Sequence, residues 1–274
     1  MTAWLRRAPR RLRSVAWLRR RWPSAALRLV DLRFPDEYVA AHIPGSSSPD
    51  LPHSLPDQAR LQILLAEIDW APEVELVLLD AHAGVLAARL FWMLECFRIH
   101  NTALLDGGLD AWKDAGLALE PGERPAPAEA AAAAPPFDPS RAAGAAELRA
   151  ALNDRDAIIL DVRNASEYGR ELPLAGQFPA GHIPGALNLP WEETLFSPRG
   201  TIKLLQPAWA LRRRLRRMGI TPRRGVCVYC DTGMRSGHSY FVLRHLGFPR
   251  VQLYEGGWIE WSRLGYPTRL GPNP

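Results

Sequence analysis

The chain has 274 residues, enough for one large domain or two of average size, and 47% of them are hydrophobic, which indicates a folded protein. It contains no apolar run of about 18 residues, so no membrane span is expected. The net charge of +5 is modest, with arginines crowded before the first acidic residue, Asp31. We interpret this start and a second basic run at 212–217 as solvated helix faces, with targeting or nucleic-acid or membrane contact as alternatives for the start. Neither nucleic acid nor a membrane is an expected partner.

In chain order, short apolar runs alternate with helical patterns. The runs at 76–79, 157–160 and 226–229 have the length of buried strands, and 84–97 and 207–218 have helical spacing. This alternation is typical of an α/β fold in which a parallel sheet is flanked by helices on both faces.

The chain also repeats itself. Val30–Ser46 and Leu160–Ala186 share Asp-x-Arg, Glu-Tyr and His-Ile-Pro-Gly in the same order, and Leu104–Trp112 recurs as Leu253–Trp261. Ordered matches of this kind predict a duplicated domain. A Pro- and Ala-rich stretch between the copies indicates a linker, so we expect a first domain at 14–119, a linker at 120–142 and a second domain at 143–274.

The three cysteines form no disulfide framework and fit a reducing cytoplasm, which is the expected location. Cys227 and Cys230 have the spacing of a redox pair, but residues three apart on a strand point to opposite faces, too far apart for a disulfide. Cys96 and Cys227 are expected in the core.

Cys230 stands where a reactive thiolate is expected. It follows the apolar run 226–229, and the loop from Asp231 to Arg235 separates it from a helical pattern that starts near Ser236. Inward-pointing N–H groups beside the start of a helix form a cradle for an anion. Such surroundings favour a thiolate, which makes Cys230 the candidate nucleophile.

Two other positions bear on this site. The Asp161–Arg163 segment also follows a predicted strand, and because ligands bind at the carboxyl ends of parallel strands, Arg163 is a candidate for binding an anionic substrate. An ion pair with a local carboxylate such as Glu167 is the structural alternative. In the first copy Asp80 aligns with Cys230, and since a carboxylate lacks thiolate chemistry, we expect that copy to be catalytically silent.

The two Asp-x-Arg…His-Ile-Pro-Gly segments, the Cys-Asp-Thr-Gly-Met-Arg loop and the two Gly-Gly…Trp endings together resemble the tandem-domain rhodaneses, a family of sulfurtransferases. The resemblance extends from about residue 14 to 268. It implies an inactive first domain and a second domain whose cysteine takes a sulfur atom from a donor as a persulfide and passes it to an acceptor. It implies no metal and no organic cofactor. The implied site consists of the sulfur carrier Cys230 and the substrate-binding residues Arg163, Asp231, Thr232, Gly233, Met234 and Arg235.

The resemblance implies a small anionic sulfur donor and a thiol or cyanide acceptor, with thioredoxin or another protein thiol as a candidate. The loop is more similar to the Cys-Gln-Thr-His-His-Arg-Ser-Gly loop of thiosulfate-using bacterial relatives than to the Cys-Gly-Ser-Gly-Val-Thr loop of mercaptopyruvate-using ones. Thiosulfate is therefore the favoured donor and 3-mercaptopyruvate the alternative. Asp231 departs from both loops, because a carboxylate beside Cys230 opposes thiolate formation and repels dianions unless it points to solvent or pairs with Arg235.

Other functions fit the same cysteine. A cysteine-loop phosphatase or arsenate reductase has one residue more between cysteine and arginine than the four that separate Cys230 from Arg235, which favours sulfur transfer. A protein-to-protein persulfide relay and a non-enzymatic rhodanese-like module remain open. His42 and His182 occur in both copies, including the silent one, which favours a turn or packing role for them.

Overall fold

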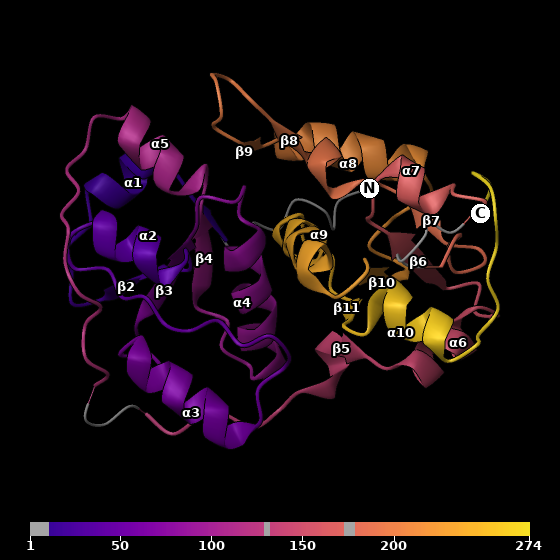
Figure 1. Cartoon of the computed structure of the whole chain (residues 1–274), viewed down its shortest axis with the longest axis horizontal. Coiled ribbons are helices and arrows are strands. Elements are labelled where there is room, and N and C mark those ends of the chain that lie inside the picture. Colours follow the sequence, from indigo (N-terminus) through magenta and orange to yellow (C-terminus); the bar gives the residue numbers. More distant parts are fainter. Residues whose placement is uncertain (1–10, 129–131, 173–178) are drawn as a thin grey trace. The chain divides into compact units, whose positions relative to one another are not determined.

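The structure, a computed structural model, describes residues 11–128, 132–172 and 179–274. It divides into two compact units (Figure 1). The first contains the described residues up to Asp138 and the segment Ser197–Leu205, and the second contains Pro139–Phe196 and Gln206–Pro274. The segment Ser197–Leu205, which includes β9 (Leu204–Leu205), thus packs with the first unit although it lies within the sequence of the second copy.

The first unit is built on a four-stranded parallel sheet with the order β1-β4-β3-β2. Its strands are β1 (Leu12–Arg13), β2 (Leu27–Asp31), β3 (Glu75–Leu79) and β4 (Thr102–Leu105). Its helices are α1 (Val15–Arg19), α2 (Pro35–Ala40), α3 (Gln58–Glu67), α4 (Val85–Cys96) and α5 (Gly108–Asp114).

The second unit has a five-stranded parallel sheet with the order β5-β11-β10-β6-β7. Its strands are β5 (Ala142–Ala143), β6 (Ala157–Asp161), β7 (Leu187–Asn188), β10 (Gly225–Tyr229) and β11 (Val251–Tyr254), with β8 (Leu195–Phe196) outside this sheet. Its helices are η2 (Pro139–Arg141), α6 (Ala145–Ala151), α7 (Ala165–Tyr168), η3 (Trp191–Thr194), α8 (Ala208–Arg217), α9 (Met234–His245) and α10 (Gly257–Arg263).

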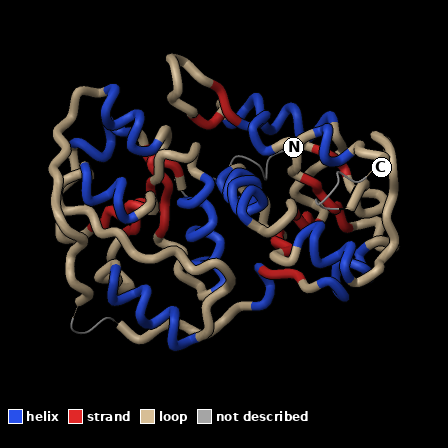
Figure 2. Tube along the Cα trace, in the orientation of Figure 1, coloured by secondary structure: helices blue, strands red, loops and turns tan. Residues whose placement is uncertain are grey.

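Figure 2 shows the same arrangement in both units, with strands inside and helices around them. The order β1-β4-β3-β2 corresponds to β5-β11-β10-β6, so the two copies of the sequence fold alike. The predicted α/β class, with parallel sheets flanked by helices, is confirmed. Among the helices in the described ranges, none combines the length and the apolar character of a bilayer-spanning segment.

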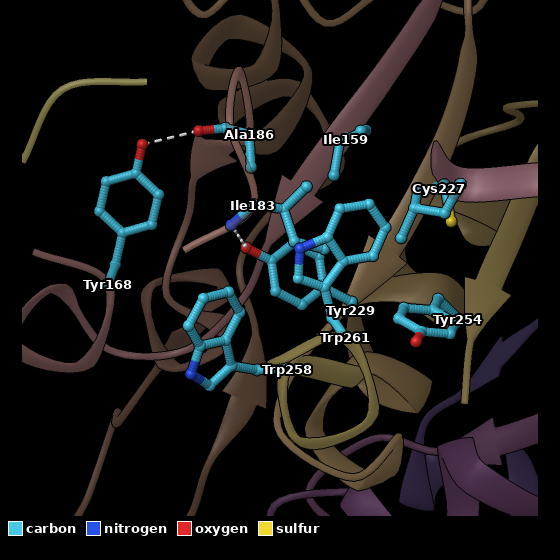
Figure 3. Close-up of a cluster of buried hydrophobic side chains, with 10 residues drawn as sticks. Ile159, Tyr168, Ile183, Ala186, Cys227, Tyr229, Tyr254, Trp258 and Trp261 are labelled. Carbon is cyan, nitrogen blue, oxygen red and sulfur yellow. Dashed lines mark hydrogen bonds between the residues drawn. The ribbon is translucent and has the colours of Figure 1, made fainter. Parts of the chain in front are cut away.

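The core of the second unit gathers aromatic side chains from β10, β11 and α10 (Figure 3). Trp258 and Trp261 are fully buried in it, and the hydroxyl of buried Tyr229 accepts a hydrogen bond from the N–H of Ile183 at 3.2 Å. Cys227 belongs to this core, as predicted, and burial raises its pKa to about 12. A thiol with such a pKa is a poor nucleophile at neutral pH.

Candidate active site

Cys230 directly follows β10, which lies between β6 and β11 in the sheet. A loop of four residues, 230–233, then leads into α9, whose N-cap Gly233 has a φ of 85°. This left-handed conformation favours glycine and permits the abrupt turn from strand to helix. The cysteine therefore lies at the carboxyl end of a central parallel strand and at the N-terminus of a 12-residue helix, where anions bind.

A second loop holds the backbone of this turn in place. The Trp258 N–H donates to the Cys230 carbonyl at 2.8 Å. Gly257 has a φ of 59°, and a Cβ at this position would overlap the carbonyl oxygens of Cys230 and Asp231. The physical role of the Gly-Gly…Trp ending could not be read from the sequence. In the structure its backbone packs directly against the Cys230 loop and hydrogen-bonds to it.

The Cys230 side chain is buried, with 1% of the residue exposed. Its Sγ lies 3.6 Å from the Oγ of Ser236 in the first turn of α9. The Ser236 hydroxyl donates to the Gly233 carbonyl at 2.9 Å, so its oxygen faces the sulfur as an acceptor for a thiol proton. After loss of that proton, rotation of the hydroxyl lets Ser236 donate to the thiolate instead. The contact of Ser236 with the Cys230 sulfur was not predicted from the sequence. The signal that could have indicated it is the position of Ser236, three residues after Gly233 at the start of the helix.

Arg235 joins the loop to α7. Its Nη1 and Nη2 donate to the two carboxylate oxygens of Glu167 at 2.8 and 2.9 Å, and Nη2 also bonds the carboxylate of Asp231. Glu167 is itself fixed, because its Oε2 accepts the N–H of Asn164 in a capping box at the start of α7. Asp231 thus pairs with Arg235, one of the two arrangements expected from the sequence.

The two carboxylates bonded to Arg235 differ in their affinity for protons. Burial raises the pKa of Asp231 to about 6, although the charges of Arg163 and Arg235 act in the opposite direction. Burial alone would raise the pKa of Glu167 too, but the hydrogen bonds and charge of Arg235 outweigh it and lower the pKa to about 2. Glu167 therefore remains the ionised partner of Arg235, while Asp231 takes up a proton near pH 6.

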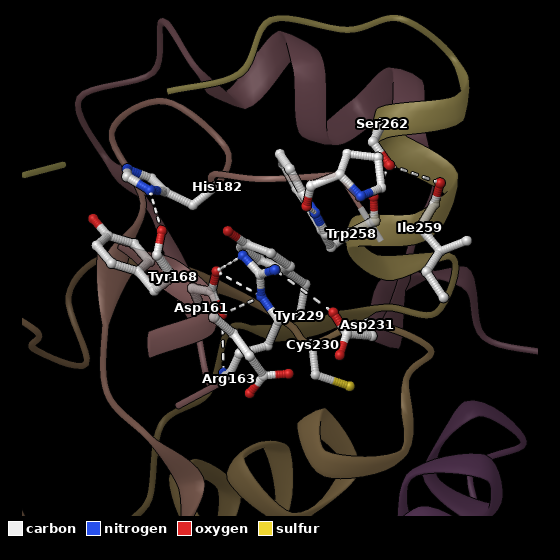
Figure 4. A network of polar contacts seen from close by, with 12 residues as sticks. Asp161, Arg163, Tyr168, His182, Tyr229, Cys230, Asp231, Trp258, Ile259 and Ser262 are labelled. Carbon is white, nitrogen blue, oxygen red and sulfur yellow. Dashed lines mark hydrogen bonds and ion pairs between the residues drawn. The ribbon is translucent and has the colours of Figure 1, made fainter. Parts of the chain in front are cut away.

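Arg163 is buried and bonded within its own turn (Figure 4). Its Nη2 lies 2.7 Å from Asp161 Oδ2 and donates to the Gly181 carbonyl at 2.9 Å, while Nη1 lies 3.6 Å from Asp231 Oδ1. The first unit repeats this pair, with Arg33 Nη2 2.7 Å from Asp31 Oδ2. Because the pair also occurs in the first copy, where Asp80 stands in place of Cys230, the geometry favours the structural alternative, in which Arg163 pairs with a local carboxylate, here Asp161.

The first unit carries a carboxylate where the second carries the cysteine. Oδ1 of Asp80 accepts the N–H groups of His82 at 2.7 Å and Gly84 at 2.9 Å, and Oδ2 accepts that of Ala87 at 2.9 Å. The Asp80 carbonyl accepts the N–H of Leu109 at 3.0 Å, as the Cys230 carbonyl does in the second unit. The cradle of the first unit is therefore filled by an anion of its own.

Of the remaining predicted loop residues, Gly233 is buried, Met234 is half-buried and Thr232 is exposed. The two histidines pack as predicted. The His42 ring stacks on Tyr38 with 3.9 Å between centroids, and His182 stacks on Tyr168 at 3.7 Å.

Comparisons with known proteins identify the family. The rhodanese-like domain matches the chain twice, over residues 14–115 and 144–264. A thiosulfate sulfurtransferase of Pseudomonas aeruginosa is 35% identical over 86% of this chain and 88% of its own length. The 3-mercaptopyruvate sulfurtransferase of Escherichia coli K12 is 29% identical over 90% and 92% of the two chains. The sulfur carrier protein TtuD of Thermus thermophilus is 30% identical over 96% and 98%.

Among solved structures, the anaerobic ergothioneine biosynthesis enzyme of Chlorobium limicola has a TM-score of 0.82 and 24% identity, covering 97% of this chain and 71% of that one. This likeness shows a shared fold. The chain belongs to the rhodanese family. Its relatives also confirm the predicted class of enzyme, a sulfurtransferase.

Proposed function

We propose that Cys230 carries the transferred sulfur. The observation that carries this proposal is the equivalence of Cys230 and Asp80: in the first unit, three N–H groups bind a carboxylate at the position where the second unit has a cysteine. A loop that holds one negative charge at this place is suited to a thiolate, and then to a persulfide. We further propose that the first unit is inactive, because Asp80 occupies its cradle. We also propose that the two copies of the sequence form domains at 14–119 and 143–274 joined by the 120–142 linker, although Ser197–Leu205 packs with the first unit.

The reaction proceeds in two displacements. The Cys230 thiolate attacks the outer sulfur of the donor, the donor's S–S bond breaks, and its electron pair leaves with sulfite when the donor is thiosulfate. A nucleophilic acceptor then takes the outer sulfur from the persulfide and regenerates the thiolate. The N–H groups of residues 231–235 stabilise the persulfide and the departing anion, while Arg235 anchors the loop.

Thiosulfate is the proposed donor and 3-mercaptopyruvate the alternative. The relative from Pseudomonas aeruginosa, 35% identical, is named for thiosulfate, and the relative from Escherichia coli, 29% identical, is named for 3-mercaptopyruvate. The acceptor is cyanide or a thiol, and a protein thiol such as that of thioredoxin fits the same chemistry. The likeness to a named sulfur carrier protein favours, as a second candidate function, relay of the persulfide to another protein. We propose that the protein acts in the cytoplasm, since all three of its cysteines are free, as is usual in a reducing compartment.

Thiocyanate formation from thiosulfate and cyanide tests the proposal. The wild-type protein is expected to form thiocyanate and Cys230→Ser to form none. Cys227→Ser is the matched control, because Cys227 is also buried and lies on the strand that leads to Cys230, yet it belongs to the core. Loss of turnover in Cys227→Ser, with activity retained in Cys230→Ser, would contradict the proposal, because it would identify Cys227 as the reactive thiol.

A further inference from the structure

Within the described part of the second unit, the network of ion pairs beside Cys230 carries more negative than positive charge. The connected network contains two guanidinium groups and three carboxylates, which leaves a net charge of −1 when all are ionised; its members are Arg163, Arg235, Asp161, Glu167 and Asp231. The thiolate of Cys230 adds a second negative charge. These side-chain charges therefore repel a donor with two negative charges, in opposition to the attraction of the loop N–H groups.

Arg235 offers little attraction to offset this repulsion. Both of its terminal nitrogens already bond Glu167, and one also bonds Asp231. An anionic donor that binds Arg235 has to share or displace these carboxylates. Of these two carboxylates, that of Asp231 belongs to the residue next to Cys230 in the chain, and it also lies 3.6 Å from Arg163.

The carboxylate of Asp231 distinguishes the second unit from the first. The residue after Asp80 is Ala81, which has no charge. The carboxylate of the helix cap, in contrast, is common to both units. Glu37 accepts the N–H of Phe34 at 3.1 Å, as Glu167 accepts that of Asn164 at 3.0 Å. The carboxylate of Asp231, next to Cys230, is thus present in the second unit and has no counterpart at the same position of the first.

We propose that Asp231, together with Glu167, determines which sulfur donors Cys230 accepts, by disfavouring dianions such as thiosulfate relative to monoanions such as organic thiosulfonates and persulfides. This inference rests on the proposed persulfide function of Cys230. The chemistry is the same for both kinds of donor: a new S–S bond forms to Cys230 and the donor's S–S bond breaks. Its electrons leave with sulfite from thiosulfate or with sulfinate from a thiosulfonate, and neither an oxidant nor a proton is consumed.

Thiosulfate and methanethiosulfonate isolate the effect of charge, because both present a sulfane sulfur on an oxidised sulfur but carry two charges and one. The measurement is kcat/KM for each donor with cyanide as acceptor. Asp231→Asn removes one negative charge, so both donors should gain in kcat/KM. The ratio of thiosulfate to methanethiosulfonate should rise about 15-fold, the effect of one charge at roughly 10 Å in an effective dielectric of about 20. Glu167→Gln should shift the ratio in the same direction. Added salt should reduce the discrimination of the wild type.

Glu37→Gln is the matched control, since it alters the same cap in the first unit, and it should leave the ratio unchanged. An unchanged ratio in both Asp231→Asn and Glu167→Gln would overturn the inference, as would an equal loss with both donors in both variants, which indicates a purely structural loop. Those outcomes leave the persulfide function intact if the wild type uses the donors. Failure of the wild type to use both thiosulfate and methanethiosulfonate would overturn the proposed function as well.

Discussion

The carboxylate that fills the cradle of the first unit is a measurable source of stability. In Asp80→Ala, three N–H groups lose a charged acceptor: those of His82 and Gly84, whose bonds are part-buried, and that of Ala87, whose bond is buried. A hydrogen bond to a charged group is worth about 1.5 kcal/mol at the lower end of its usual range, so the three together amount to about 4–5 kcal/mol of unfolding free energy. Asp80→Asn keeps one oxygen, which accepts two of these bonds, and should cost about 2 kcal/mol.

Urea denaturation followed by circular dichroism measures these changes through the midpoint and slope of the transition of the first unit. Asp36→Ala is the control, because Asp36 is an exposed carboxylate in the first turn of α2. Sulfate or phosphate should restore part of the stability of Asp80→Ala by occupying the vacated cradle. A loss below about 1 kcal/mol, or no response to either anion, would refute the view that Asp80 is an internal ligand of an anion site.

Three further outcomes follow from the site. Gly257→Ala should destabilise the second unit by more than about 3 kcal/mol and depress thiocyanate formation, because its Cβ would overlap the Cys230 and Asp231 carbonyls. Gly265→Ala, with a similar φ of 65° and open space for a Cβ, should cost only about 1 kcal/mol. Equal losses of stability in urea denaturation would contradict the close approach of Gly257 to these carbonyls. As the pH falls from 7 to 5, Asp231, whose pKa is about 6, becomes protonated, so the thiosulfate-to-methanethiosulfonate ratio of kcat/KM should rise, and Asp231→Asn should remove that step. The double variant Cys230→Ser, Asp80→Cys should form no thiocyanate, because the loop of the first unit has no arginine; turnover would disprove this.

Local patterns in the sequence were sufficient to predict the fold and the candidate cysteine. Strands and helices alternate with clear breaks, so the predicted helix 84–97 matches α4 (Val85–Cys96) and the predicted run 226–229 matches β10 (Gly225–Tyr229). The alignment of the two copies also placed Asp80 opposite Cys230. The structure agrees, since the carbonyl of each accepts an N–H from the Gly-Gly loop that follows β4 or β11.

Contacts between distant parts of the chain were not predictable in the same way. Arg235 and Glu167 are 68 positions apart, and their pairing depends on how α7 and α9 are placed by the sheet. Helical periodicity likewise gives no reason for Ser197–Leu205 to pack with the first unit. For Arg163 a signal was present: Asp-x-Arg occurs in both copies, as the histidines do, and a motif retained in the copy that we propose to be silent indicates a structural role.

The most direct test of the account is intact-mass spectrometry of the wild type and Cys230→Ser after incubation with thiosulfate. The account predicts a gain of about 32 Da, one sulfur atom, in the wild type alone, reversed by cyanide. The same gain in Cys230→Ser, or no gain in the wild type with thiosulfate, methanethiosulfonate or 3-mercaptopyruvate, would contradict the assignment of Cys230 as the sulfur carrier.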